Sequence, residues 1–102
     1  MNNDKIRFGP FELDPKAGEL RHGGRRVRLQ ERPLKMLVAL LATPGEVVTR
    51  EEMLREVWGD HGEPTTRTVD NHLATLRAKL EPIPSEPRHF LTVHGVGYKF
   101  TQ

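Results

Sequence analysis

Side chains suited to hydrogen bonding with nucleic acid gather in the segment from residue 67 to residue 80, RTVDNHLATLRAKL. On a helix of about 100° per residue, one narrow stripe is apolar and consists of Val69, Leu73, Leu76 and Leu80. The opposite face carries Arg67, Asn71, Ala74, Thr75 and Ala78. The two alanines let a partner approach the backbone, and an asparagine amide can bond both the N6 and N7 edges of adenine. The segment therefore predicts a helix that can enter the major groove.

The flanks of this helix carry Thr68, His72 and Lys79 on one side and Arg77 on the other, placed to reach phosphates. Small residues also occur by chance on exposed helix faces. The helix taken alone leaves that alternative open.

A second stretch, residues 88–100 (RHFLTVHGVGYKF), alternates β-branched and aromatic residues around a glycine-containing tip. The alternation predicts a β-hairpin, and Gly95 and Gly97 are expected to supply the positive φ of a tight turn. His94 and Lys99 put polar or positive groups near the tip. The alternative is a plain edge hairpin that closes a small core.

These two stretches, together with PFELDPKAGEL near the start and GEVVTREEMLREVWG in the middle, resemble the C-terminal effector domain of OmpR/PhoB-type response regulators. The resemblance runs from Phe8 to Phe100. It implies an α+β winged helix-turn-helix fold, with a three-helix core, an N-terminal antiparallel β-sheet and a C-terminal β-hairpin wing. The implied function is sequence-specific binding of double-stranded DNA in transcriptional control. The helix would lie in the major groove and the wing at the minor groove.

The resemblance also implies roles for individual residues. Positions that face bases are Asn71, Ala74 and Thr75, with His94 at the minor groove. Positions that touch the DNA backbone are Trp58, Arg67, Thr68, His72, Arg77, Thr92, Tyr98 and Lys99. The family often carries Arg or Lys at positions 74 and 75 and Arg at position 94, so these departures put base specificity in question more than DNA binding. Trp58 has a second, compatible interpretation as a core aromatic.

The partners implied are double-stranded DNA, RNA polymerase, a receiver domain, and a second copy on tandem half-sites. The acidic connection 59–66 matches the loop that contacts RNA polymerase in the family, with Asp60 and Glu63 as the candidates. A plain turn between two helices is the alternative there. A winged helix that binds only protein, without DNA, is the rival function. A domain that docks only its own regulatory partner is a second rival.

The elements that must position these residues can be placed from the chain. Strands are expected at 6–13, broken by Gly9-Pro10, and as a hairpin at 19–21 and 26–29, giving a sheet over about 5–29 with one wet face. A buried helix runs from 31 to about 43, and Thr49-x-x-Glu52 begins the next with a capping box. The helical core spans about 31–81 and the wing about 88–101, in a single domain of residues 1–102.

Charge is unevenly distributed along the chain. Residues 16–35 hold seven Lys or Arg against two acids, and residues 45–64 hold two Arg against six acids. Such segregation suits a protein that meets an anion on one side, although two solvated surfaces are the plainer explanation. No apolar run is long enough to span a membrane, and the absence of Cys fits a cytoplasmic location. No catalytic motif, cofactor motif or metal-ligand spacing among the five His is recognisable, so neither an enzyme, a cofactor nor a zinc site is expected.

Overall fold

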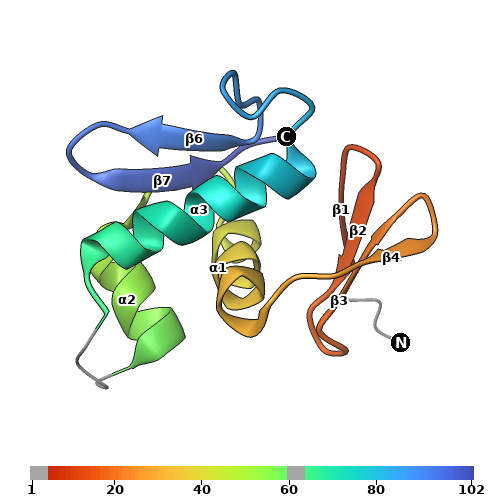
Figure 1. Cartoon of the computed structure of the whole chain (residues 1–102), viewed down its shortest axis with the longest axis horizontal. Helices are drawn as coiled ribbons and strands as arrows, with labels where there is room; N and C mark the ends of the chain where they lie inside the picture. The colour runs from red at the N-terminus through yellow and green to blue at the C-terminus, as the bar shows by residue number, and fades with distance from the viewer. Residues whose placement is uncertain (1–4, 60–63) are drawn as a thin grey trace.

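A computed structural model of the chain describes residues 5–59 and 64–102 (Figure 1). The chain begins with a four-stranded antiparallel sheet in which sequence neighbours pair, in the order β1-β2-β3-β4. Its strands are β1 (Ile6–Phe8), β2 (Phe11–Asp14), β3 (Glu19–His22) and β4 (Arg25–Val27). Val27 and Leu29 are half-buried while Arg26 and Arg28 are exposed, which confirms the predicted wet face.

Three helices follow: α1 (Glu31–Ala42), α2 (Arg50–Trp58) and α3 (Thr66–Leu80). α1 is apolar around most of its circumference and packs against both other helices, so it forms the centre of the core. The predicted capping box of α2 is confirmed. The Thr49 hydroxyl accepts the Glu52 N–H at 3.0 Å, and the Glu52 carboxylate accepts the Thr49 N–H at 2.8 Å.

The wing belongs to a three-stranded sheet ordered β5-β7-β6, made of β5 (Val48–Thr49), β6 (Phe90–Val93) and β7 (Gly97–Phe100). Gly95 at the hairpin tip has φ of 76°, as the turn requires. The prediction that Gly97 also has positive φ is wrong. A Cβ on Gly97 would lie 2.1 Å from the Val48 carbonyl oxygen, so this glycine is needed for the close approach of β5 and β7.

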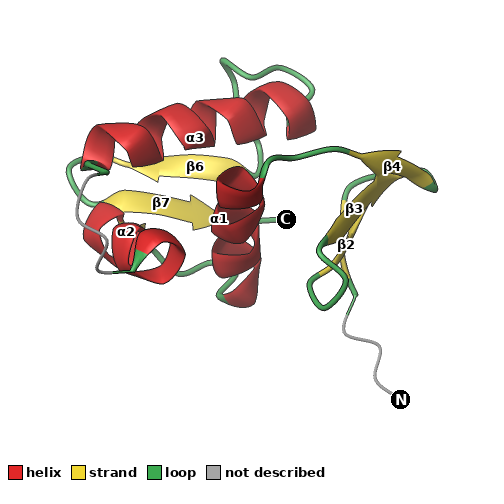
Figure 2. Ribbon diagram, turned by 60° about the horizontal axis from the view of Figure 1, so that its bottom comes forward, coloured by secondary structure: helices red, strands yellow, loops and turns green. Residues whose placement is uncertain are grey.

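Aromatic rings connect the two sheets through the core. The Phe8 ring of the N-terminal sheet lies 6.1 Å from the Phe90 ring and 5.5 Å from the Phe100 ring, centroid to centroid. Such edge-to-face contacts stabilise the packing beyond the area they bury. The N-terminal sheet is thereby held at one end of the molecule, with α2 at the other (Figures 1 and 2).

Within residues 5–59 and 64–102, none of the helices combines the length and apolar character needed to span a bilayer. The same part of the chain brings together no three His, Cys, Asp or Glu side chains that could hold a metal ion.

Candidate nucleic-acid interface

The exposed face of α3 has the composition that the helical wheel predicts. Arg67, Asn71, Ala74, Thr75 and Ala78 are all exposed. The apolar stripe of Val69, Leu73, Leu76 and Leu80 is buried. The Thr75 hydroxyl donates to the Asn71 carbonyl at 3.3 Å, which fixes the Thr75 rotamer and leaves its methyl group and lone pairs for a partner. The helix therefore presents a low, polar ridge that no other described element covers.

The first turn of α3 carries two of the predicted backbone contacts. The Thr68 hydroxyl accepts the Thr65 N–H at 3.4 Å, so its own O–H remains available as a donor. The Arg67 guanidinium is exposed and has no acceptor in the described part of the chain. Both side chains are thus free to donate to an anion at the start of the helix.

Trp58 is a core residue with an accessible edge, so both interpretations of it are compatible. Its ring stacks on His72, with centroids 5.5 Å apart and an interplanar angle of 17°. The Arg32 guanidinium lies 5.6 Å from the same ring centroid and donates to the Val57 carbonyl at 2.6 Å. Across the residues described, the only fully buried side-chain N or O atom without a partner is Thr43 Oγ1, so the Trp58 N–H reaches solvent. His72 is held in place by this stacking.

The wing is tied to α3 by a charged network that the sequence did not reveal. Asp70 Oδ1 accepts hydrogen bonds from the Tyr98 hydroxyl at 2.6 Å and from Arg50 Nε at 2.8 Å. Burial alone would raise the pKa of Asp70, but these two donors hold it below its ordinary value. Burial and then the Asp70 carboxylate raise the pKa of Tyr98. The three groups join α2, α3 and β7 in one hydrogen-bonded unit.

Arg77 strengthens the same junction through contacts with the wing. Its Nε and Nη2 donate to the Phe90 carbonyl at 3.0 and 2.7 Å, and Nη2 also donates to the Thr92 hydroxyl at 2.9 Å. The guanidinium carbon lies 5.7 Å from the Tyr98 ring centroid. The structure thus brings Arg77, Thr92 and Tyr98 together, but each has a partner within the chain. Their assignment to DNA phosphates stays a prediction. The observed contacts show in addition that these side chains position the wing beside α3.

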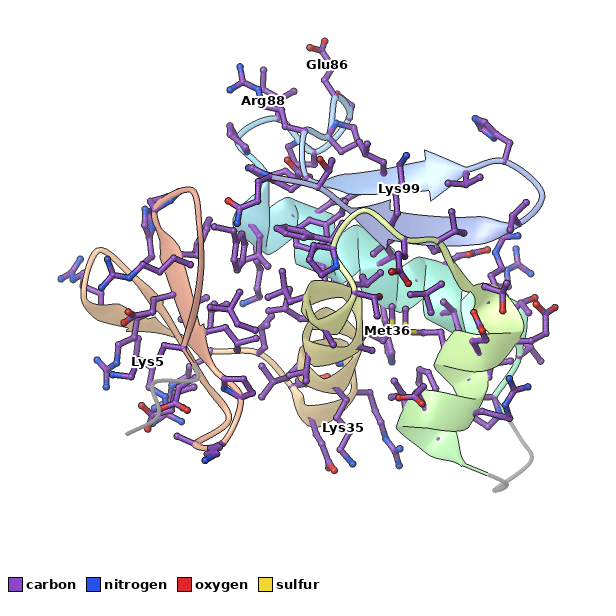
Figure 3. The ribbon with its side chains drawn as sticks, turned by 180° about the vertical axis from the view of Figure 1, so that it is seen from behind. Lys5, Lys35, Met36, Glu86, Arg88 and Lys99 are labelled. Atoms are coloured by element: carbon purple, nitrogen blue, oxygen red, sulfur yellow. The ribbon has the colours of Figure 1, made fainter. Side chains whose placement is uncertain are left out.

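Lys99 lies on the opposite side of the wing from these residues. Tyr98 faces α3, and successive strand residues point to opposite faces, so Lys99 faces away from α3 (Figure 3). His94 is exposed at the hairpin tip. Val96, at the same tip, is 44% exposed. Asp60 and Glu63, the candidates for polymerase contact, lie outside the described residues.

Comparison with known proteins places this arrangement among transcription factors. Residues 24–100 match the family described as "Transcriptional regulatory protein, C terminal". The DNA-binding response regulator MtrA of Mycolicibacterium smegmatis is 38% identical over 96 residues, covering 94% of this chain and 42% of the relative. The transcriptional regulatory protein SrrA of Staphylococcus aureus is 40% identical over 98 residues, covering 95% and 41%. The chain therefore spans less than half the length of these curated relatives.

Solved structures have the same fold. The response regulator DrrB of Thermotoga maritima, an OmpR/PhoB homolog, has a TM-score of 0.87 at 32% identity, covering 96% of this chain and 44% of that one. The DNA-binding domain of RstA from Klebsiella pneumoniae, solved in complex with the RstA box, has a TM-score of 0.84 at 30% identity, covering 97% and 98%. These likenesses confirm the predicted winged helix-turn-helix fold.

Proposed function

Because this chain belongs to the family of C-terminal domains of transcriptional regulatory proteins, we propose that it binds double-stranded DNA sequence-specifically and thereby regulates transcription. α3 enters the major groove with Asn71, Ala74 and Thr75 toward the bases. The wing approaches the adjacent minor groove with His94. Arg67, Thr68, His72 and the Trp58 N–H donate to phosphates on the flanks.

The observation that carries this proposal is the fixed relation between an uncovered α3 face and the wing. The Tyr98–Asp70 and Arg77–Phe90 hydrogen bonds hold the hairpin beside the helix before any partner arrives. A preorganised pair of elements loses less conformational entropy on binding than two mobile ones. The RstA domain, with the same fold, was solved with its DNA box, which supports the proposal.

The test is the salt dependence of binding between the purified 102-residue chain and duplex DNA, using both a random sequence and a site obtained by selection. A DNA-binding domain loses affinity steeply as salt rises, with a slope of about −0.9 in log K against log salt for each phosphate neutralised. Arg67→Gln should flatten that slope by about one phosphate. Arg55→Gln removes an exposed Arg from α2. It is the matched control and should leave the salt slope unchanged. A module that binds only protein would bind neither duplex.

The finer partners belong to the same proposal and rest on the family resemblance. We propose that Asp60 and Glu63 meet a basic surface of RNA polymerase, that a receiver domain regulates this chain, and that two copies occupy tandem half-sites. Charge reversal of Asp60 and Glu63 should then reduce transcription activation in a reconstituted assay while leaving DNA affinity unchanged. Because we propose DNA as its partner, we also propose a cytoplasmic location for the protein.

A further inference from the structure

The basic stretch of residues 16–35 is not used by the interface described above, and the structure separates its members into two groups. Arg21 pairs with Glu19, Lys35 pairs with Glu31, and Arg32 donates to the Val57 carbonyl. Arg25, Arg26 and Arg28, by contrast, are exposed and have no acceptor in the part of the chain that the structure describes. These arginines lie on β4 and on the connection from β4 to α1.

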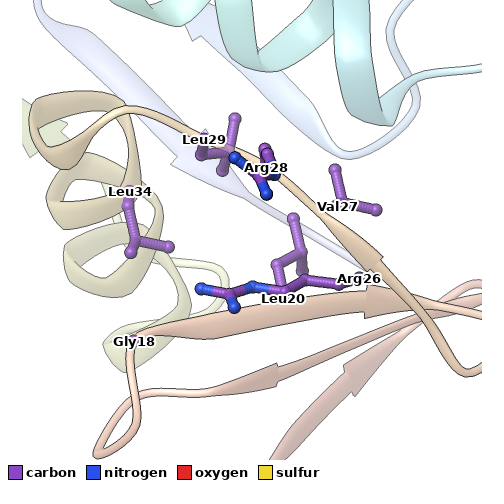
Figure 4. A pocket seen from close by; sticks show the side chains of 7 residues that line it. All are labelled: Gly18, Leu20, Arg26, Val27, Arg28, Leu29 and Leu34. Carbon is purple, nitrogen blue, oxygen red and sulfur yellow. The ribbon is translucent and has the colours of Figure 1, made fainter.

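Two adjoining hollows open beside this connection. The first, of about 250 Å³, lies between β4 and α1, and Figure 4 shows the side chains of Arg26 and Arg28 there with Leu20, Leu29 and Leu34. The second, of about 590 Å³, lies between the connection and α3, and its polar lining comes from Arg28, Gln30, His72, Thr75 and Lys79. Arg28 and Leu29 line both hollows, so the two adjoin at the connection, and we treat them together as one basic surface. We call it the basic groove, after Arg26, Arg28 and Lys79.

The charge of the basic groove differs from that of the other hollows around α1. Among the residues that the structure describes, no carboxylate lines either of its parts. The hollows on the other faces of α1 are lined by four acids and two basic residues: Glu31, Glu46, Glu52, Glu56, Lys35 and Arg55. An anion is therefore attracted more strongly to the groove than to the other faces of α1.

Lys79 anchors the groove to α3. Its Nζ donates to the Arg28 carbonyl at 3.1 Å, so the ammonium group is held at the connection and keeps two further N–H donors. Thr75 and His72, which line the groove, are also part of the α3 surface proposed to face DNA. The groove is thus continuous with that surface.

We propose that the basic groove binds a phosphate of the DNA backbone, on the strand beside the major groove that α3 enters, through Arg28 and Lys79. The inference rests on the proposed DNA-binding function. An α-helix about 10–12 Å in diameter fills a major groove about 12 Å wide, so a segment alongside the helix meets the flanking strand. Arg28 is the donor that reaches this strand from the connection between β4 and α1, and Arg26 extends the positive field outward.

The experiment measures log K against log salt for the 102-residue chain on random duplex DNA. Arg28→Gln should lower the magnitude of the slope by about 0.9, the value for one phosphate. Over a fourfold rise in salt, the variant would then lose about 3.5-fold less affinity than the parent chain. Lys79→Gln should act in the same direction. Arg28→Lys keeps the charge and should retain most of the slope.

Arg7→Gln is the matched control, because it removes an exposed Arg from β1, at the sheet edge farthest from β4. Thermal unfolding of each variant verifies that it is folded before binding is compared. An unchanged slope for folded Arg28→Gln, equal to that of Arg7→Gln, would overturn the phosphate site while leaving DNA binding by α3 intact. Absence of salt-dependent binding by the parent chain would instead overturn the proposed function itself.

Discussion

At the scale of single residues, Asn71 is the side chain on which base discrimination depends most. It is exposed at the centre of the α3 face, flanked by Ala74 and by Thr75, whose hydroxyl is already bonded to the helix backbone. The two neighbours can contribute contact area but little hydrogen-bonding specificity. A bidentate amide–adenine pair discriminates against the wrong base by about 1–3 kcal/mol.

Asn71→Ala should therefore relax the preference at one base pair of the selected site by about 1–3 kcal/mol, with little change in affinity for random duplex. The measurement is competition binding against a panel of sites mutated one position at a time. Arg67→Ala is the comparison, since loss of a phosphate donor should weaken all sequences alike. Equal losses on every site for Asn71→Ala would assign its amide to the DNA backbone.

The sequence predicted correctly which residues of α3 are exposed. The exposed set on α3 follows from the spacing of its apolar residues, which is local information. The sequence did not predict contacts between residues that are far apart in the chain. The Asp70 network joins positions 20 and 28 residues apart. Nothing in a 3.6-residue period indicates such a contact.

At the scale of elements, the junction between α3 and the wing decides how both reach DNA. Arg77 holds it by donating to the Phe90 carbonyl and the Thr92 hydroxyl of β6. The two-residue strand β5 completes the wing sheet from the other edge, through Gly97 of β7. A strand of two residues shows no alternation, so the sequence predicted the hairpin but not its third strand.

Arg77→Ala should lower the free energy of unfolding by about 1–3 kcal/mol, because it removes charge-assisted hydrogen bonds and leaves a half-buried carbonyl with fewer partners. Affinity should fall on all sequences, since the wing loses its fixed position. Urea unfolding measures the first effect and duplex binding the second. Arg67→Ala, on the same helix but exposed, should lower affinity without lowering stability. If Arg77→Ala behaves in that same way, Arg77 is a phosphate contact and not a positioning residue.

At the scale of the whole molecule, charge is sorted in space as well as along the chain. The basic connection lies toward the N-terminal sheet, whereas α2 at the other end exposes Glu51, Glu52 and Glu56 (Figure 1). The sequence predicted the segregation but not which basic residues stay unpaired, because pairing depends on how the strands fold back on one another. Arg25, Arg26 and Arg28, for example, meet no acid among the described residues, although Arg26 and Arg25 lie opposite Arg21 and His22 of β3.

One carboxylate connects the helices to the wing. Glu81, directly after α3, is only 6% exposed, and its Oε1 accepts the Arg88 N–H at 2.9 Å. Its Oε2 accepts the N–H groups of His89 at 2.9 Å and Phe90 at 2.8 Å. Burial acts to raise the pKa of Glu81, but the three backbone donors hold it below its ordinary value. Glu81 thus fixes the loop that leads from α3 into β6.

Because the folded pKa of Glu81 is depressed, its contribution to stability is complete above the pKa of the unfolded chain and is lost as pH falls through the folded value. Glu81→Gln replaces one acceptor oxygen by an amide donor that faces backbone N–H groups, so it should lower the free energy of unfolding by about 1–3 kcal/mol near neutral pH. The difference in free energy of unfolding between parent and variant should narrow as pH falls below about 4, where glutamates ordinarily become protonated. Urea unfolding over this pH range measures this difference.

Glu86→Gln removes the same charge from an exposed position in the same loop and should leave stability nearly unchanged. A difference for Glu81→Gln that stays constant with pH would show that the carboxylate charge does not hold the loop.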